Sequence, residues 1–359
     1  MSAPRTGSAP SAGQGFSANP SSPLPDDLVL RPFDLPAARA AGLTKHAVQG
    51  PLWQRTARGV YTWSALDPED TMIRIQTAAE LLPVGAAIGG WASLFLQNTL
   101  DLDGGPEMRI RRTARIRPTR ARAGAGRTQS TGTKTLAPVA ICVGPGAKIR
   151  PRPEIDVSRR ALCPDDIVWV GAIPCLGATR SLVDLVGRQP SEEGLVSIDA
   201  ALRSQATQPD EIAAYLREHP RVLDARRIWR LLGMADGASR SCPETRMRWI
   251  WIVEAGLPRP LANPDVEDQH GQLLGLPDLF DPDSALVGES DGSQHRELHA
   301  HTSDNAREEG FERHNMVVVR ATIVDLFSRR RQLVHRLKAA YRDGCARDRS
   351  RDRWVLRSP

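Results

Sequence analysis

The sequence predicts an α+β protein built from several domains. At 359 residues the chain is long enough for two or three domains of about 150 residues each. Three stretches of the chain differ in pattern. Short helical segments and a hairpin pattern come first, alternating apolar runs and further helices follow, and the last stretch has the order helix, hairpin, helix, strand.

The composition is that of an ordinary folded protein, with 40% apolar and 25% charged residues. It excludes collagen-like, coiled-coil and wholly disordered chains. No run reaches the roughly 18 apolar residues that a membrane span requires, and no apolar segment follows Arg5 as in a secretory signal. The five cysteines lie far apart without a Cys-x-x-Cys pair, which argues against a disulfide framework and a zinc ribbon. We therefore expect a cytoplasmic protein with no membrane contact.

The N-terminal stretch has the pattern of two short helices followed by a hairpin. A helical pattern covers 35–41, Gly42 breaks it, and Thr44 is placed to cap a second helix. Residues 53–63 then alternate around a small turn, as a β-hairpin does. This order predicts a winged helix-turn-helix domain over 27–100, although a small α+β module of another kind contains the same pieces.

Cationic side chains lie at the positions where such a domain meets DNA. Lys45 and His46 open the second predicted helix, and Arg55 and Arg58 flank the turn of the hairpin. The second helix enters the groove and the wing follows the backbone, where guanidinium and ammonium groups pair with phosphate oxygens. We predict that these four residues contact double-stranded DNA.

An arginine-rich strip follows at 109–127, with eight arginines and no acidic residue. Two interpretations stay open: a solvated β-hairpin with a loop, or a strip that faces phosphates. In the second interpretation Arg109, Arg111 and Arg112 contact nucleic acid. The formal net charge of +6 does not decide between the two interpretations, because arginine richness also arises from coding bias.

The middle region, 101–235, is expected to be mixed α/β. Apolar and polar residues alternate in short runs between 136 and 175, which predicts strands, and helical patterns fill most of 179–232. Residues 233–239 have the composition of a linker, so we place the main domain boundary there.

The C-terminal domain, 240–342, begins with a helix start signal. Ser241 is a cap, Pro243 lies in the first turn, and Glu244 completes a capping box three residues after the cap. Gly256 is placed to end this helix. The capping role of Glu244 is compatible with a second role as an acid at the edge of a site.

A hairpin is expected next, because Asp-Pro-Asp-Ser at 281–284 is strong turn chemistry. Pairing of 276–280 with 285–291 sets Asp278 and Glu289 side by side. Asp291 lies on the strand face of Glu289, because strand side chains alternate between faces.

Three carboxylates on one sheet face repel each other unless a cation neutralises them. A hard divalent ion with oxygen ligands, Mg²⁺ above all or Mn²⁺, is the natural partner. His295, just past the strand, is placed to donate or accept a proton or to orient an attacked phosphate.

The order of these residues forms a longer pattern over about 241–330. Its parts are Pro277-Asp278, Glu289-x-Asp291-Gly292-x-x-His295, Asp304-x-x-Arg307 and Val317-Val318-Val319-Arg320. The pattern resembles the Vsr-like (very-short-patch-repair-like) endonuclease domains of the PD-(D/E)XK superfamily. The resemblance implies an α/β restriction-endonuclease-like fold for this domain.

The same resemblance implies roles for the acidic residues. Asp278 and Glu289 would be metal ligands and catalytic, and Asp291 would stand where the wider superfamily has lysine. His295 would help the in-line attack of water on phosphorus. Independently of the resemblance, Glu244, as the acid at the edge of the site, joins the candidate catalytic residues. Arg307 would contact DNA.

Three positions depart from the family pattern. Gly288 stands where the strand usually has an aliphatic residue, Ser290 where it has an aromatic one, and His314 where a helix ends in Gly. The fold tolerates the last change if Asn315 takes the left-handed conformation.

A second resemblance concerns the rest of the chain. The hairpin ending Arg58-Gly59-Val60-Tyr61 resembles the winged-helix module of AbiEi-type abortive-infection antitoxins. The stretches 179–185 and 198–202 are similar to the middle region of those proteins. This resemblance implies a cognate toxin protein as a partner.

Two functions follow from these patterns. The first is a DNA-binding protein with a Mg²⁺-dependent endonuclease domain, acting in DNA repair or in defence against phages and mobile elements. The alternative is an AbiEi-type antitoxin or transcriptional repressor whose nuclease-fold domain is non-catalytic. The presence of Asp278, Glu289 and His295 together favours catalysis, and a purely structural adaptor explains neither the wing nor these acids.

Both chain ends are expected to be tails. Residues 1–26 are rich in Ser, Pro, Gly and Ala, which predicts disorder. An apolar stripe of helical period over 323–341 predicts one core helix, and 343–359 is expected to be a flexible tail of alternating charge.

Overall fold

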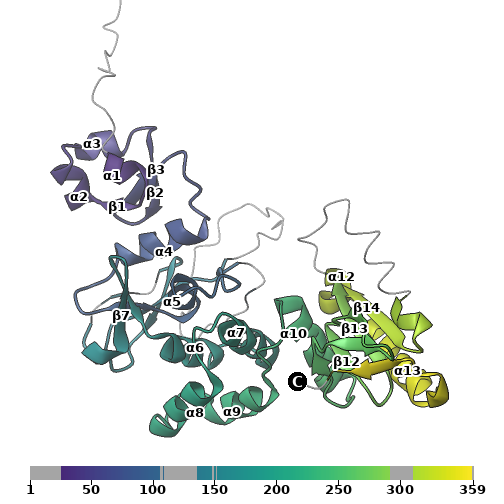
Figure 1. The fold of residues 1–359 in the computed structure, drawn as a ribbon. Coiled ribbons are helices and arrows are strands. Elements are labelled where there is room, and N and C mark those ends of the chain that lie inside the picture. The colour runs from purple at the N-terminus through teal and green to yellow at the C-terminus, as the bar shows by residue number, and fades with distance from the viewer. Residues whose placement is uncertain are drawn as a thin grey trace, which may run out of the picture. The chain divides into compact units, whose positions relative to one another are not determined.

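The computed structural model describes residues 26–105, 108, 136–147, 149–150, 152–291 and 310–357. The chain is an α+β protein that divides into two compact units, 1–73 and 74–359 (Figure 1). No helix within the described ranges is both long and apolar enough to cross a membrane.

Unit 1 contains the short helices and the hairpin that the sequence predicts. Phe33 and Trp53 form an edge-to-face pair, with ring centroids 5.0 Å apart, at the centre of a small core. Gly42, at a φ of +81°, turns the chain between the two helices, and the Thr44 hydroxyl caps the second by accepting from Ala47 N at 3.1 Å. The elements are α1 (Asp26–Val29), β1 (Phe33–Asp34), α2 (Leu35–Ala40), α3 (Lys45–Val48), β2 (Trp53–Ala57) and β3 (Val60–Trp63), with the strands in the antiparallel order β1-β3-β2.

Unit 1 ends before the predicted domain boundary at residue 100. The segment after Ile73 belongs to the second unit, because Ile75, Trp91 and Leu94 are fully buried in the core of that unit. Only 27–73 of the expected 27–100 domain therefore packs as one body.

The first part of unit 2 is a five-stranded mixed sheet with helices packed around it. The strand order is β6-β5-β4-β8-β7. The strands are β4 (Ala87–Gly89), β5 (Val139–Cys142), β6 (Ile155–Ser158), β7 (Ile167–Val170) and β8 (Ile173–Leu176), and the helices are α4 (Thr71–Ala79), α5 (Gly90–Leu96), α6 (Ala178–Val186), α7 (Ser191–Arg203), α8 (Pro209–Glu218) and α9 (Ala225–Met234). Helices α6 to α9 pack on one another and form a cluster in Figure 1. The predicted strands at 136–175 and helices at 179–232 are therefore confirmed.

The second part of unit 2 contains the predicted C-terminal helix, hairpin and final strand. The hairpin strands pair antiparallel, and the last strand joins them in parallel, in the sheet order β14-β13-β12-β9. Helix α10 packs against β13, and α13 against β13 and β14. The elements are α10 (Cys242–Trp249), a π-helical turn η2 (Ile250–Glu254), β9 (Leu261–Ala262), β10 (Val266–Asp268), β11 (Leu273–Gly275), β12 (Leu279–Asp281), β13 (Leu286–Asp291), β14 (Val317–Thr322), α12 (Ile323–Phe327), α13 (Arg330–Cys345) and β15 (Trp354–Leu356).

Local signals set the ends of these elements as predicted. The Ser284 amide donates to the Asp281 carboxylate at 3.0 Å, which closes the turn of the hairpin. Gly256 ends the first helix at a φ of +65°, and Asn315 takes the left-handed conformation at a φ of +69°. The departure from glycine at His314 is therefore accommodated.

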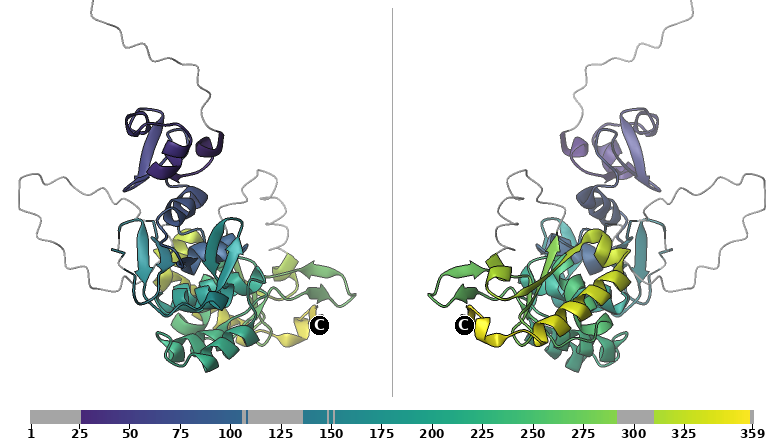
Figure 2. Two further views of the ribbon diagram at one scale, coloured as in Figure 1. Left: turned by 90° about the vertical axis from the view of Figure 1, so that its left-hand side faces the viewer. Right: turned by 90° about the vertical axis from the view of Figure 1, so that its right-hand side faces the viewer.

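The C-terminal tail is ordered through Arg357, in contrast to the expected flexible segment 343–359. Trp354 packs edge-on against Phe280, with ring centroids 5.0 Å apart, and Arg347 pairs with Asp352 at 2.8 Å. Strand β15 completes a three-stranded sheet, β11-β10-β15. Figure 2 shows β10 and β11 as a green hairpin that extends outward from the C-terminal part. The alternating charges that suggested a frayed end are pairs that hold it in place.

The expected helix over 323–341 is two helices, because the backbone leaves helical geometry at Arg329, where φ is −114° and ψ is 30°. The short strands β9 and β10, which follow the first helix of this part, belong to different sheets. Asn263 lies between them with a φ of +48° and turns the chain.

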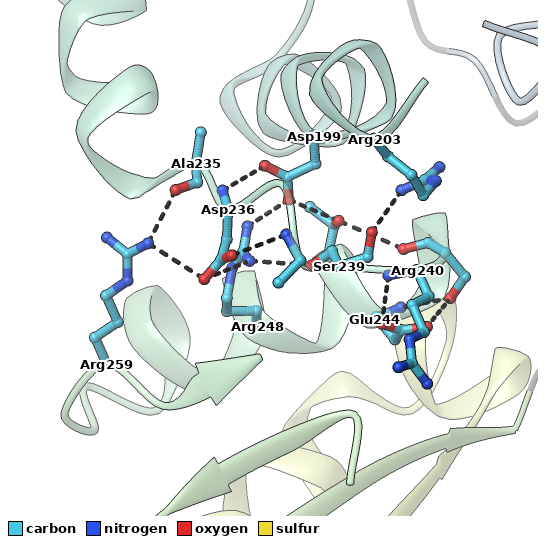
Figure 3. Close-up of polar contacts among 12 residues, drawn as sticks. Asp199, Arg203, Ala235, Asp236, Ser239, Arg240, Glu244, Arg248 and Arg259 are labelled. Atoms are coloured by element: carbon cyan, nitrogen blue, oxygen red, sulfur yellow. Dashed lines mark hydrogen bonds and ion pairs between the residues drawn. The ribbon is translucent and has the colours of Figure 1, made fainter. Parts of the chain in front are cut away.

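The segment expected to be a linker, 233–239, is fixed by a buried ionic network instead (Figure 3). Asp199 on α7 and Arg248 on α10 form an ion pair in which both side chains have no exposed surface. The Asp199 carboxylate also accepts from Asp236 N at 2.9 Å, and Arg248 donates to the Ser239 hydroxyl at 3.0 Å. Burial raises the pKa of the Asp199 carboxyl, and Arg248 opposes that effect.

Two further arginines connect α7 with the C-terminal part. Arg246 of α10 pairs with Glu193 at 2.8 Å and with Glu192 at 3.2 Å, both on α7. Arg330 of α13 pairs with Glu192 and, at 2.7 Å, with Glu254. The two parts of unit 2 are thus joined by ion pairs, and the sequence boundary near 235 is not a flexible hinge.

We predict that Arg248→Ala lowers the free energy of unfolding by about 3–5 kcal/mol, because it leaves the Asp199 carboxylate buried without its counter-charge. Urea denaturation followed by circular dichroism measures this. Arg259→Ala is the matched control: Arg259 also reaches Asp236, at 3.5 Å, but is 46% exposed, so its loss should cost about 1 kcal/mol or less. If both variants lost the same free energy of unfolding, the buried pair would contribute no more to stability than an exposed pair does.

Candidate nucleic-acid interface and carboxylate pair

The predicted DNA-contacting residues of unit 1 are all exposed. Lys45 and His46 form the first turn of α3, directly after the Thr44 cap, so their side chains lie at the free N-terminal end of that helix. Arg55 is exposed in the middle of β2, and Arg58 is exposed at the turn before β3. Gly59 closes this turn at a φ of +88°, a conformation that glycine adopts without strain.

These positions suit an anionic partner. Lys45, Arg55 and Arg58 place three cationic side chains on the exposed surface of unit 1, and His46 adds a further N–H donor. The predicted contacts Arg109, Arg111, Arg112 and Arg307 lie outside the described residues, as does His295.

The hairpin brings Asp278 and Glu289 to facing positions. Leu279 pairs with Gly288 across the hairpin, and the same antiparallel register extended by one residue sets Asp278 opposite Glu289. In the parallel pairing on the other side, Glu289 lies beside Arg320 of β14. The juxtaposition of two carboxylates therefore follows from the turn at 281–284.

Asp278 is held in place by a serine that the sequence pattern did not indicate as a site residue. The Ser290 amide and the Ser290 hydroxyl both donate to Asp278 Oδ2, each at 2.7 Å. Charge-assisted bonds of this kind fix the carboxylate orientation. Ser290 thus positions the Asp278 carboxylate, a role that a small polar residue beside the acid could have signalled.

Gly288 has a packing role. A Cβ at this position would lie 2.9 Å from the Met247 methyl group and 3.2 Å from the Trp251 ring. Met247 and Trp251 are fully buried, so the glycine lets the first helix approach the hairpin strand closely. This departure from the family pattern is therefore a consequence of close helix–sheet packing.

Glu244 is engaged as a capping and bridging residue. Its buried carboxylate accepts from Arg240 N at 2.7 Å, from the Ser241 hydroxyl at 2.8 Å and from Asn263 Nδ2 at 2.7 Å. Asn263 N in turn donates to the carbonyl of Asp278 at 3.1 Å. Glu244 therefore lies close to the carboxylate pair through Asn263, while both of its own oxygens already accept hydrogen bonds.

A metal ion at this hairpin would have few protein ligands. Within the described ranges, no three His, Cys, Asp or Glu side chains are grouped as a metal site, and Asp291 is exposed at the strand end. Asp278 and Glu289 supply two carboxylates, which suits Mg²⁺ only where water and phosphate oxygens complete its shell. The side chains that the structure describes therefore supply only part of the ligand shell of such an ion.

A known family model matches part of this chain. Residues 119–234 match the family model of the AbiEi antitoxin C-terminal domain, which confirms the similarity that the stretches 179–185 and 198–202 suggested. No curated protein and no solved structure matches the chain. The comparisons give no support to the expected resemblance of 240–342 to Vsr-like endonucleases.

The matched range lies within the first part of unit 2 and begins after α5. Its described portion contains strands β5 to β8 and helices α6 to α9, including Asp199, the centre of the buried network. The antitoxin-like region and the C-terminal part therefore form one compact unit.

Proposed function

We propose that this chain is an AbiEi-type antitoxin that binds double-stranded DNA and regulates transcription, with a cognate toxin protein as its partner. The match of 119–234 to the antitoxin C-terminal domain carries the proposal. This was the alternative of the two functions that the sequence suggested, and endonuclease activity has no comparable support.

Unit 1 is the proposed DNA-binding part, as a winged helix-turn-helix. Two short helices joined by a tight turn, followed by a hairpin, match the elements of that module. Lys45 and His46 would face the groove from α3, and Arg55 and Arg58 would contact phosphates from the wing. Support comes from their exposure on a unit with its own core.

We predict that the triple variant Lys45→Ala/Arg55→Ala/Arg58→Ala loses most duplex affinity in a fluorescence-anisotropy titration, with an unchanged melting temperature. Because each neutralised phosphate contributes roughly −0.9 to the slope of log K against log salt, the slope should become shallower by about 3. Arg331→Ala/Arg342→Ala, two exposed positions on α13, controls for loss of charge. An unchanged slope in the triple variant would remove unit 1 from the interface.

The antitoxin role predicts rescue of growth. If the protein encoded next to this one is a nucleotidyltransferase-like toxin that arrests growth, co-expression of this chain should restore growth. The DNA-binding triple variant should lose repression of a promoter fusion and keep the rescue if antitoxicity belongs to unit 2. Absence of any rescue by the wild-type chain would contradict the antitoxin proposal while leaving DNA binding open.

A second candidate function is metal-dependent phosphodiester hydrolysis by the C-terminal part. The facing positions of Asp278 and Glu289 favour it. These two residues would hold Mg²⁺ or Mn²⁺, which when bound would activate water and stabilise charge on the phosphate. Ser290 would orient Asp278, Glu244 would keep the helix start beside the hairpin, and Asp291, His295 and Arg307 would stand near the substrate.

We predict that, if this candidate holds, calorimetric titration of wild type with Mg²⁺ and Mn²⁺ shows binding at millimolar concentration. Glu289→Gln and Asp278→Asn should abolish that binding, since each removes one of two carboxylate ligands. Glu218→Gln on the exposed end of α8 is the control. Absence of binding in the wild type at millimolar metal would rule out the enzyme and leave the C-terminal part as a binding module.

A further inference from the structure

A cavity of about 400 Å³ lies in the antitoxin-like part of unit 2, between the β4–β5–β6 side of the sheet and helix α6. Its inner wall is made of core side chains, including Trp91, Ile141 and Val183, each with no exposed surface. Protein interiors are normally packed to the density of organic crystals. A cavity of this volume beside a well-packed core is therefore unusual.

Small residues on the sheet side create the space. Gly89, Gly90 and Ala140 line it, and a Cβ on Gly90 would come within 3.2 Å of the Ala140 Cβ. Gly90 also has a φ of +57°, which favours glycine there. The turn from β4 into α5 therefore contributes no side chain to fill the cavity.

The rim of the cavity carries an exposed apolar side chain, which is unusual for a large aliphatic residue. Leu223 lines the cavity and is 58% exposed, and Val157 of β6 lines it half-buried. Apolar walls that face no partner atoms lose dispersion contacts. An apolar body of a ligand would regain those contacts.

Two ion pairs connect β6 and the residues after it to the α6 side. Arg188 pairs with Asp156, and Arg160 pairs with Asp184, and all four residues line the cavity. Each pair is neutral as a unit. The two pairs therefore connect the walls and add no net charge to the lining.

Arg159 gives the lining one positive charge in excess. It lines the cavity and is exposed, and it donates to the carbonyl of Ile149 at 2.6 Å. Among the described side chains no carboxylate is paired with it. An exposed guanidinium that is not paired with a protein carboxylate can bind the carboxylate or sulfonate group of a ligand.

We propose that this cavity binds a small amphipathic monoanion, with its apolar body against Val157 and Leu223 and its anionic head at Arg159. The volume lies in the range of pockets that enclose small organic ligands. The proposal is independent of the proposed DNA binding, since its residues all lie in unit 2.

The test uses anilinonaphthalene sulfonate, an aromatic monoanion, titrated into the full-length protein at neutral pH. The fluorescence rise should saturate with one probe per chain, and octanoate should displace the probe at lower concentration than octanol does. Val157→Trp, which fills the cavity, should weaken probe binding at least tenfold. Val168→Trp on exposed strand β7 is the control and should bind as the wild type does.

The Arg159→Gln variant tests the ionic contact to the ligand separately from the apolar contacts. It should weaken the probe and octanoate about tenfold and leave octanol unchanged, because only the ionic contact is lost. Ala140→Leu is a second filling variant, in case Val157→Trp melts at a lower temperature. Undiminished binding in a folded filling variant, or no saturable binding in the wild type, overturns the proposal.

Discussion

The buried pair of Asp199 and Arg248 is the constraint on which the arrangement of unit 2 depends. A charge with no exposed surface is costly unless it is paired and hydrogen-bonded. Asp199 has Arg248, Thr245 and the Asp236 amide as donors, so α7, α10 and the segment before α10 are held together. The geometry that satisfies these groups fixes where the C-terminal part begins.

This constraint bears on function. The family match ends at residue 234, next to Asp236, and the helix that carries Arg248 also packs on the hairpin of Asp278 and Glu289. Helix α10 therefore contacts both the antitoxin-like helix α7 and the hairpin strand β13. The same packing explains Gly288, because a side chain there would push α10 away from the sheet.

The elements of unit 1 and the hairpin of the C-terminal part follow from local chemistry. The Thr44 hydroxyl accepts from the amide three residues on, and the Asp281 carboxylate accepts from the Ser284 amide. In both cases the two bonding partners are close in the sequence. Exposure of Lys45, Arg55 and Arg58 is likewise the ordinary state of charged residues on such elements. These features could be predicted because sequence separation and spatial contact coincide.

The sequence by itself determined the α+β class, the main helices and strands, the hairpin register that sets Asp278 opposite Glu289, and the similarity of the middle region to antitoxins. Only the tertiary structure decided that Glu244 also accepts from Asn263, that the tail pairs as β15, and that a cavity lies beside α6. The physical reason is distance along the chain. Asp199 and Arg248 are 49 residues apart, and burial, which makes their pairing obligatory, is a property of the packed whole that no local pattern encodes.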